Sequence, residues 1–490
     1  MTRSMKAIHL MFAVWLLAST GAYASDLDGS AAKISEVESG LRAAAAISGK
    51  PVPVRGLREE MKAMHVKGVS IAVIDHGRIA WSKGYGVTQQ GGAPVNSETL
   101  FQAGSISKSL TAVAAMQLVQ DGKIKLDANV NDQLTTWHFP SNAFTQSHFV
   151  TLRELLSHTG GVNVHGFEGY AAGTAEPTLL QVLNGSPPAN SSSIQVVAVP
   201  GTAWSYSGGG YSVVQQLIID ITHTPFEKWL QQQIFIPANM QRSTFAQTLP
   251  LELANNVAMP YKENGEPVTG GPHRYPEMAA AGLWTTPTDL AKFLINIQTA
   301  WNGGDGALLQ PSAAREMLKL VKSGSSMGFD VGGSGDDRYF AKGGDTAGFA
   351  GQMVAFDSRG EGVVILTNGS DGNALADELV RSVAAAYHWP ALQTHMRSVG
   401  SVDEKKLKLL AGDYAYEERG HFSIQVEDGH LRIKQNLRPS ESMHPQNART
   451  WFTLSDDATY VFNDDNGASG YIDEDGDRVS FHRVKGKDLK

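Results

Sequence analysis

A hydroxyl group and an amine lie one helical turn apart in the segment Ser105-Ile106-Ser107-Lys108. Side chains at positions i and i+3 share one face of a helix, so a helix that begins near Gly104 would direct Lys108 toward Ser105. The N-terminus of such a helix also offers unpaired N–H groups, which favour a developing negative charge. The spacing therefore predicts a serine nucleophile that a lysine activates.

The same pattern occurs a second time, at Ser30-Ala31-Ala32-Lys33. A Ser followed by a Lys three residues later is expected about twice by chance in a chain of this length. Only the copy at Ser105 continues into an apolar pattern of helical period, which runs to Val119 and precedes Gly122 as a C-cap. We expect Lys108 to be buried with a lowered pKa, and the other copy to be solvated.

The first 24 residues have the pattern of a secretory signal peptide. Arg3 and Lys6 precede an apolar run from Leu10 to Ala18, and Ala22-Tyr23-Ala24 offers a small-residue cleavage site. The apolar run is shorter than the roughly 20 residues that span a bilayer. We expect cleavage after Ala24 and a periplasmic or secreted protein without a stable membrane span.

Composition narrows the classes of partner. The 490 residues include 41 Lys and Arg against 49 Asp and Glu, for a net charge of −8, and no Cys. Without residues 1–24, which carry two positive charges and no acid, the net charge becomes −10. Because no long basic run appears, nucleic acid and anionic membranes are not expected partners. The absence of Cys excludes disulfides and thiol catalysis.

The chain alternates between helical and strand patterns in a way that predicts two domains after the signal peptide. Residues 25–395 are expected to form a mixed α/β (α+β) domain with a helical insertion over roughly residues 126–285. Its predicted helices and strands are Leu57–Val66, Val69–Ile74, Arg78–Trp81, Thr288–Ile297, Gln352–Phe356, Gly362–Thr367 and Ala374–Tyr387. Asp75-His76-Gly77 predicts a hairpin between the first two of these strands.

A linker from Trp389 to Glu404 leads to a region of different character. Residues 405–490 contain short strand-like runs and are expected to form a small all-β domain. The runs are Phe422–Val426, Leu431–Lys434, Trp451–Leu454, Thr459–Phe462 and Val479–Arg483.

Four further segments stand in a characteristic order after Ser105. They are Leu155-Leu156-Ser157-His158-Thr159-Gly160-Gly161, Tyr206-Ser207-Gly208, the stretch Ala279 to Leu290, and Lys342-Gly343-Gly344-Asp345-Thr346-Ala347-Gly348-Phe349. Over roughly residues 50–390 the set resembles the serine β-lactamase and penicillin-binding-protein superfamily, and within it class C β-lactamases, DD-peptidases and related esterases. The resemblance implies a β-lactamase/transpeptidase-like fold, in which helices flank an antiparallel sheet. The C-terminal region resembles a β-rich domain that some members carry.

The resemblance also implies an acyl-enzyme mechanism. Ser105 would attack a carbonyl carbon, while Lys108 and Tyr206 would relay its proton and later activate water. Ammonium groups near Tyr206 would lower the pKa of its phenol and make it a usable base. The oxyanion hole would consist of the backbone N–H groups of Ser105 and Asp345.

Two positions depart from the family pattern, and both bear on the choice of substrate. Gly208 stands where Tyr-x-Asn has an amide, and Gly343 stands where Lys-Thr-Gly has a hydroxyl. Gly343 and Gly344 would let a substrate approach the backbone closely, and Lys342 keeps a charge suited to a substrate carboxylate. An ester or a D-residue peptide is therefore expected ahead of a β-lactam as substrate.

Competing motifs are weaker. Gly324-Ser325-Ser326-Met327-Gly328 matches a hydrolase elbow, but a helical pattern precedes it and strand-like residues follow, which is the reverse of the required order. His158 is expected to be a structural hydrogen-bonding residue, and His165 has no metal-binding context. Asp473, Asp475 and Asp477 lack the Gly and Glu of a calcium loop and are typical of a polar turn. We expect neither a metal nor a cofactor.

Two other functions are compatible with the residues. The first is a non-catalytic protein that binds penicillin or a cell-wall fragment, and the second is a protein whose C-terminal domain gives it its main role by binding a partner. The presence of Ser105, Lys108, Tyr206 and Lys342 together favours the enzyme. The sequence leaves the oligomeric state open.

Overall fold

The computed structural model describes residues 29–416, 420–435, 440–474 and 477–484. The predicted signal peptide and its cleavage after Ala24 lie outside these residues. The chain divides into two compact units, of which the first contains residues 57–383 and the segment that ends at Glu36. The second combines residues 37–56 with the chain from Ala384 onward.

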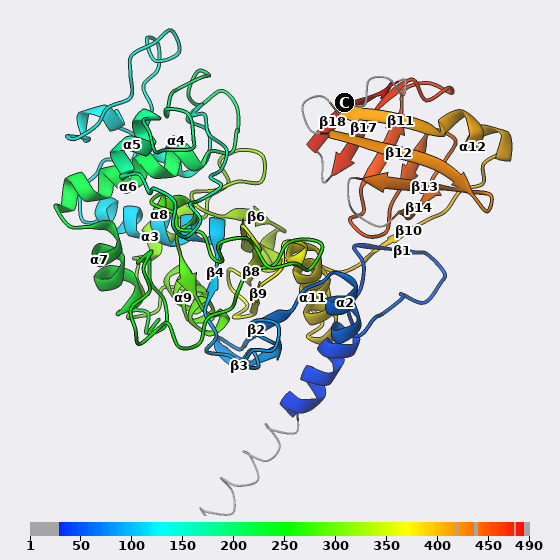
Figure 1. Cartoon of the computed structure of the whole chain (residues 1–490), viewed down its shortest axis with the longest axis horizontal. Helices are drawn as coiled ribbons and strands as arrows, with labels where there is room; N and C mark the ends of the chain where they lie inside the picture. The colour runs from blue at the N-terminus through cyan, green and yellow to red at the C-terminus, as the bar shows by residue number, and fades with distance from the viewer. Residues whose placement is uncertain (1–28, 417–419, 436–439, 475–476, 485–490) are drawn as a thin grey trace, which may run out of the picture. The chain divides into compact units, whose positions relative to one another are not determined.

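A six-stranded antiparallel sheet forms the framework of the first unit (Figure 1). Its strands follow the order β3-β2-β9-β8-β7-β6, so that segments far apart in sequence become neighbours. The predicted hairpin is present, with Asp75 opposite Arg78, and β2 also pairs with β9. The bounds are β2 Gly68–Asp75, β3 Arg78–Gly86, β6 Asp330–Gly332, β7 Tyr339–Thr346, β8 Phe349–Phe356 and β9 Gly362–Thr367.

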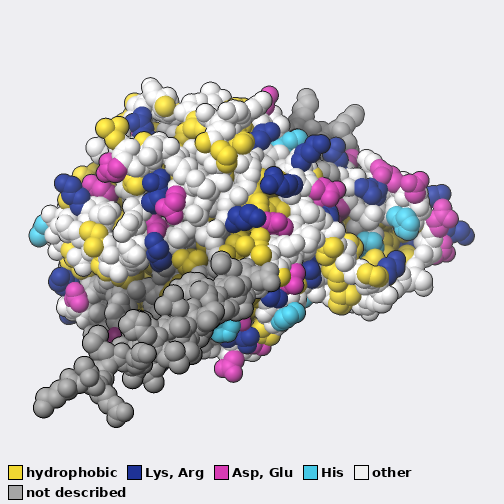
Figure 2. Space-filling model, turned by 90° about the horizontal axis from the view of Figure 1, so that it is seen from below, with side chains coloured by type: hydrophobic (Ala, Val, Ile, Leu, Met, Phe, Trp, Pro, Cys, Tyr) yellow, Lys and Arg dark blue, Asp and Glu magenta, His cyan; other side chains and the backbone are white. Residues whose placement is uncertain are grey.

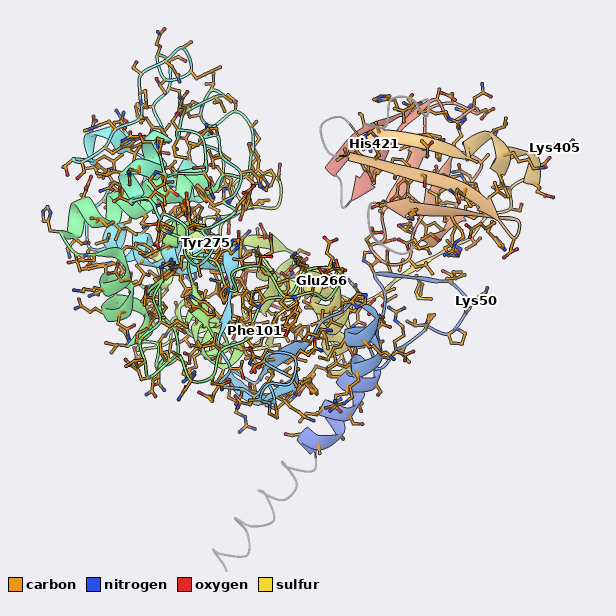
Figure 3. All side chains as sticks on the ribbon, in the orientation of Figure 1. Lys50, Phe101, Glu266, Tyr275, Lys405 and His421 are labelled. Carbon is orange, nitrogen blue, oxygen red and sulfur yellow. The ribbon has the colours of Figure 1, made fainter. Side chains whose placement is uncertain are left out.

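Helix α3 (Ser107–Gln120) is buried over most of its circumference. A helix that is apolar on every side belongs in the interior, and α3 lies in the same core cluster as the sheet residues Val364 and Leu366. Helix α9 (Pro287–Trp301) packs against β2 and β9. Phe101, labelled in Figure 3, is fully buried in this core.

The stretch between the two halves of the sheet contains several helices, most of them short, which are joined by long irregular segments. Its helices are α4 (Leu152–Leu156), α5 (Leu179–Asn184), α6 (Gly208–Thr222), α7 (Phe226–Leu230) and α8 (Met278–Ala281), with shorter turns at η2 (Val130–Asp132) and η3 (Gln231–Phe235). The remaining elements of the unit are α2 (Leu57–Ala63), β4 (Phe101–Gln102), η1 (Gly104–Ile106), β5 (Trp284–Thr285), α10 (Pro311–Met317) and η4 (Gly335–Asp337), and α11 spans Gly372–Ala386.

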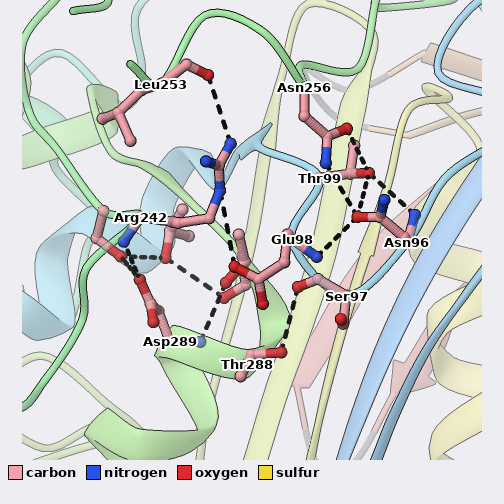
Figure 4. A network of polar contacts seen from close by, with 12 residues as sticks. Asn96, Ser97, Glu98, Thr99, Arg242, Leu253, Asn256, Thr288 and Asp289 are labelled. Carbon is pink, nitrogen blue, oxygen red and sulfur yellow. Dashed lines mark hydrogen bonds and ion pairs between the residues drawn. The ribbon is translucent and has the colours of Figure 1, made fainter. Parts of the chain in front are cut away.

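A polar network fixes the start of α9 to two loops (Figure 4). Thr288 Oγ1 donates a hydrogen bond to the carbonyl oxygen of Ser97 at 3.2 Å, and the backbone N–H of Arg242 donates to Asp289 Oδ2 at 2.8 Å. Thr99 Oγ1 donates to Asn256 Oδ1 at 2.9 Å. These bonds hold the chain that leads into β4 and onward to Ser105.

The second unit contains a closed barrel of eight antiparallel strands, which confirms the predicted all-β C-terminal region. Its strands are β11 (Gly412–Tyr416), β12 (Gly420–Glu427), β13 (His430–Gln435), β14 (Glu441–Pro445), β15 (Thr450–Phe452), β16 (Thr459–Phe462), β17 (Ser469–Glu474) and β18 (Asp477–Val484), and α12 (Glu404–Leu410) precedes them. Large buried side chains fill its interior, including Tyr414, Trp451 and Tyr460.

One feature of the second unit was not predicted from the sequence. The short strand β1 (Ala45–Ile47) pairs in parallel with β10 (His395–Arg397), which lies within the expected linker. The backbone N–H of Ala45 also donates to the carbonyl oxygen of Leu454. Residues 37–56 therefore pack with the C-terminal part of the chain, although residues 57–383 lie between the two in sequence.

Basic and acidic side chains are interspersed on the face drawn in Figure 2. This dispersion agrees with the nearly balanced numbers of basic and acidic residues. Among the residues that the structure describes, no helix combines the length and apolar character needed to cross a membrane.

Candidate active site

Ser105 lies in the short turn η1, directly before α3 begins. The helix therefore starts as a tight turn, and Ser107 stabilises it because its hydroxyl donates to the carbonyl oxygen of Gly104 at 2.6 Å. This geometry places Ser105 at the N-terminal end of a buried helix, where the helix dipole favours negative charge.

Lys108 is buried and reaches back toward Ser105. Its Nζ donates to Ser105 Oγ at 3.0 Å and to the carbonyl oxygen of Ala280 at 2.7 Å. Burial lowers the pKa of Lys108 because the ammonium loses its hydration, and Tyr206 opposes only part of that shift. The two polar contacts hold Nζ next to the Ser105 hydroxyl.

Tyr206 comes from a different part of the chain and completes this contact. Ser207 caps α6, since its hydroxyl accepts from the backbone N–H of Gly210, and Tyr206 lies directly before that cap. The Tyr206 hydroxyl donates to Ser105 Oγ at 2.7 Å. Burial alone would raise the pKa of Tyr206, but the charges of Lys108 and Lys342 outweigh burial and lower it.

His158 supports the Tyr206 ring, as expected of a structural residue. The two ring centroids are 4.3 Å apart, and His158 Nδ1 accepts a hydrogen bond from the backbone N–H of Ser207 at 3.1 Å. Burial, followed by the charges of Lys342 and Lys108, lowers the pKa of His158 well below its ordinary value. A neutral imidazole therefore fixes the start of α6.

Lys342 lies on β7, and its Nζ is 5.3 Å from the centroid of the Tyr206 ring. The Lys342 side chain is buried and forms an ion pair with Asp330 Oδ2 at 3.1 Å. Burial would lower the pKa of Lys342, but the charges of Asp330 and Tyr206 raise it above its ordinary value. Lys342 thus remains an ammonium and stabilises a Tyr206 phenolate.

The backbone of β7 passes very close to the turn that carries Ser105. A Cβ atom at Gly344 would lie 2.8 Å from the backbone nitrogen of Ser105, and one at Gly104 would lie 2.6 Å from the backbone nitrogen of Asp345. Only glycine permits such an approach. The two N–H groups of the expected oxyanion hole are thereby brought to one place beside Ser105.

Other side chains occupy the space at the two departures from the family pattern. A Cβ atom at Gly208 would lie 3.1 Å from a ring carbon of Phe167, and one at Gly343 would lie 2.8 Å from Gln352 Oε1. The backbone N–H of Gly208 also donates to the carbonyl oxygen of His165 at 2.9 Å. Neither the missing amide nor the missing hydroxyl could be restored here without moving a neighbour.

The competing motifs lie in unsuitable surroundings. Ser326 is buried between α10 and β6, and its hydroxyl donates to the carbonyl oxygen of Phe329. Lys33 pairs with Glu36 within the helical stretch 29–39. Asp473 pairs with Arg478, while Asp475 lies outside the described residues. Among the residues described, no group of His, Cys, Asp and Glu could hold a metal ion.

Three groups at the site were not found from the sequence, namely Asp330, the carbonyl oxygen of Ala280, and Gln352. Each depends on a contact between distant segments, such as the pairing of β6 with β7 that places Asp330 opposite Ala341. A partial signal was available, because Asp330 follows the Gly-x-Ser-x-Gly match by two residues and precedes Lys342 by twelve.

The sheet, the buried helix and the Ser-Lys-Tyr arrangement define the serine-hydrolase fold of β-lactamases and penicillin-binding proteins. The family model described as Beta-lactamase matches residues 55–388. The chain therefore belongs to this family, whose members are serine hydrolases.

Relatives and solved structures agree with this assignment. PbpX of Bacillus subtilis (strain 168) is 27% identical over 307 residues, which are 62% of this chain and 70% of PbpX. Further curated relatives are matched over only 48% and 44% of their own length.

Two solved structures are similar in fold. The octameric penicillin-binding protein homologue of Pyrococcus abyssi has a TM-score of 0.60 and 21% identity, with 86% of this chain and 98% of that chain covered. The D-amino acid amidase of Ochrobactrum anthropi SV3 has a TM-score of 0.54 and 22% identity, with 68% and 96% covered.

Proposed function

We propose that this protein is an exported serine hydrolase that transfers an acyl group from an ester, an amide or a D-residue peptide to water through Ser105. The observation that carries the proposal is that Ser105 Oγ lies 3.0 Å from Lys108 Nζ and 2.7 Å from the Tyr206 hydroxyl. In this arrangement Ser105 can serve as the nucleophile, and Lys108 and Tyr206 can serve as its bases.

The reaction has two stages. Ser105 Oγ bonds to the substrate carbonyl carbon as its proton passes to the Tyr206 phenolate, and the leaving group then departs with a proton from Tyr206 or Lys108. In the second stage the same base takes a proton from water, which attacks the acyl carbon, and it returns that proton to Ser105 Oγ as the bond between Ser105 and the acyl group breaks. Both tetrahedral oxyanions accept hydrogen bonds from the N–H groups of Ser105 and Asp345.

The substrate preference follows from the two departures at Gly208 and Gly343. At these two positions the chain lacks the amide and the hydroxyl of the family pattern, and a Cβ atom there would lie close to Phe167 and to Gln352. Esters and amides that do not need those contacts are therefore the favoured substrates, and β-lactams are the slower ones. The D-amino acid amidase whose solved structure is similar in fold is, by its name, an enzyme that acts on amides, which is compatible with amide substrates here.

Hydrolysis of 4-nitrophenyl acetate by wild type, Ser105→Ala and Ser326→Ala tests the proposal. We expect Ser105→Ala to lose at least about a hundredfold in kcat/KM, while Ser326→Ala keeps the wild-type value. Equal rates in wild type and Ser105→Ala would disprove the assigned nucleophile.

The same proteins are then incubated with a simple penicillin and examined by intact-protein mass spectrometry. A Ser105-dependent adduct that persists, without turnover of any ester or amide, would support the alternative of a non-catalytic binding protein. Fast penicillin turnover would contradict the substrate ranking.

A further inference from the structure

The ammonium group of Lys342 already has an anionic partner inside the protein. Its Nζ lies 3.1 Å from Asp330 Oδ2, and the side chain of Lys342 is 8% exposed whereas that of Asp330 is 52% exposed. The exposed member of this pair is therefore the carboxylate. A substrate carboxylate that approached Lys342 would encounter Asp330 and compete with it.

Asp330 is held firmly in this position. It begins β6 and pairs with Ala341, the residue before Lys342. Two residues earlier, the carbonyl oxygen of Gly328 accepts from Ser109 Oγ at 2.6 Å, and the backbone N–H of Gly328 donates to the carbonyl oxygen of Leu156 at 3.0 Å. These bonds and the pairing with β7 anchor the backbone before Asp330 to α3, the helix that begins directly after Ser105, and so place the Asp330 side chain next to Lys342.

A second carboxylate adds to the negative charge at the site. Asp345 is exposed on β7, and its charge acts on Lys108. The charges of Lys108 and Lys342 are therefore opposed by the carboxylates of Asp330 and Asp345, and also by Tyr206 when it is a phenolate. A site of this composition offers an anionic substrate no net attraction, because its carboxylates repel a like charge at short range.

We propose that Asp330 is a specificity-determining residue that disfavours acyl donors with a carboxylate on the leaving-group side of the scissile bond. The favoured substrates are then esters and amides whose leaving group is uncharged, and penicillins belong to the disfavoured class. This inference rests on the proposed acyl-transfer function. It replaces the expectation that Lys342 serves a substrate carboxylate.

Two esters that have the same acyl group but differ in the charge of the leaving group test the effect of that charge on hydrolysis. One is 4-nitrophenyl acetate, and the other is 3-carboxy-4-nitrophenyl acetate, which carries a carboxylate on the leaving group. The variants are Asp330→Asn, which removes the charge and keeps the shape, and Asp337→Asn as a matched control. Asp337 lies in the β6–β7 connection, is 47% exposed and forms its own ion pair with Arg359 at 3.6 Å.

In Asp330→Asn we expect kcat/KM for the carboxylate ester to rise by about tenfold, mainly through KM, since two like charges near a protein surface repel by this order. The neutral ester and the Asp337→Asn variant should change by less than about twofold. A purely structural role of Asp330 would lower kcat for both esters alike. That result, or an unchanged ratio of the two esters, would overturn the inference.

Binding of phenylboronic acid and 3-carboxyphenylboronic acid distinguishes failure of the inference from failure of the proposed function. Each boron accepts an electron pair from Ser105 Oγ, so binding needs the nucleophile but no turnover, and thermal shift reports it. If neither ester is hydrolysed, the proposed function is wrong. The charge inference still holds if Asp330→Asn tightens only the carboxylated boronate, and it fails if both boronates bind alike in the two proteins.

Discussion

Tyr206 lies between two ammonium groups, and this position decides which of its protonation states does the chemistry. Lys108 Nζ is 5.0 Å and Lys342 Nζ is 5.3 Å from the centroid of its ring. Burial would raise the pKa of Tyr206, but these charges together lower it. The phenolate, which is the form that can accept the Ser105 proton, is therefore available at a lower pH than in an ordinary tyrosine.

Replacement of Tyr206 by Phe should remove this base. We expect kcat/KM for 4-nitrophenyl acetate to fall by about 10² to 10⁴. In the wild type, kcat/KM should rise with pH through the pKa of Tyr206, because only the phenolate accepts a proton, and this rise should occur below the ordinary value of about 10. The pH profile of Tyr206→Phe should lack that rise.

Tyr211 provides the control for this variant. It lies near the same lysine, with Lys108 Nζ 5.7 Å from its ring centroid, but its hydroxyl donates to the carbonyl oxygen of Leu156. Burial raises the pKa of Tyr211 well above its ordinary value. Tyr211→Phe should keep the wild-type pH profile, and an unchanged profile in Tyr206→Phe would exclude Tyr206 as the base.

The residues at the site differ in how far the sequence could predict them. Ser105 and Lys108 follow from their spacing together with the apolar helical pattern after them, since the same spacing also occurs at Ser30 and Lys33. Tyr206 and Lys342 required the resemblance to a family, because nothing local marks a tyrosine or lysine as functional. Asp330 was missed because its role arises from the pairing of β6 with β7. The catalytic roles of the predicted site residues stay predictions.

Helix α8 combines a support for the site with a buried acid. Its Ala280 carbonyl oxygen accepts a hydrogen bond from Lys108, while Glu277 directly precedes the helix and is fully buried. Apart from its own backbone N–H, no described group donates a hydrogen bond to the Glu277 carboxyl oxygens. Burial, with a smaller contribution from the charge of Glu176, raises the pKa of Glu277 to about 7.

This raised pKa makes the stability of the first unit depend on pH. The folded state holds the Glu277 proton up to about pH 7, whereas the unfolded chain releases it near 4.5. Between these values the folded state binds more protons, so the free energy of unfolding falls as pH rises and the loss is complete above about 7. The loss is up to about 3 kcal/mol.

The Glu277→Gln variant lacks the titrating carboxyl group. Its free energy of unfolding should therefore exceed that of the wild type most at high pH. Urea unfolding at about pH 5 and about pH 8 measures the difference between variant and wild type, which should increase with pH by up to about 3 kcal/mol. Glu263→Gln, on the exposed surface of the same unit, should show no such increase. A constant difference for Glu277→Gln would mean that the carboxyl group is already ionised at low pH.

At the scale of helices and strands, segments with a strong hydrophobic periodicity were predicted well from the sequence. The strands β2 and β8 are longer than predicted, and β9 has the predicted bounds. The helices α3 and α11 begin and end within two residues of the predicted positions. The strands β1 and β10 were not predicted, because three residues carry too little periodicity and the pair forms only by a contact across the chain. The sequence likewise did not predict β11, β14 and β17, whose sequences mix polar and apolar residues without clear alternation.

Among the residues that the structure describes, the two units contain separate hydrophobic clusters. The first surrounds α3 and the sheet, and the second fills the barrel with residues such as Tyr414, Phe422 and Phe481. Aromatic side chains occupy the barrel interior, with the Tyr414 and Phe422 ring centroids 5.0 Å apart. The barrel is therefore stabilised by its own packing, which gives it the means to unfold independently of the catalytic unit.

Trp451→Ala tests whether the two units unfold separately. Trp451 is 1% exposed in the barrel core, and loss of a buried Trp costs about 3 to 5 kcal/mol. Calorimetry of the full chain should show two transitions, of which only the barrel transition moves to lower temperature in this variant. Ester hydrolysis below that temperature should remain at the wild-type rate, because Ser105, Lys108 and Tyr206 belong to the other core.

Trp137→Ala gives the reciprocal result if the units are independent. Trp137 packs in the first core, with its ring centroid 5.1 Å from that of Phe139, and its Nε1 donates to Asn184 Oδ1 at 3.0 Å. Loss of the Trp137 side chain should lower the transition temperature of the first unit and leave the transition temperature of the barrel unchanged. If either variant shifted both transitions together, the two cores would form one cooperative unit, and the barrel would contribute directly to the stability of the fold that holds Ser105.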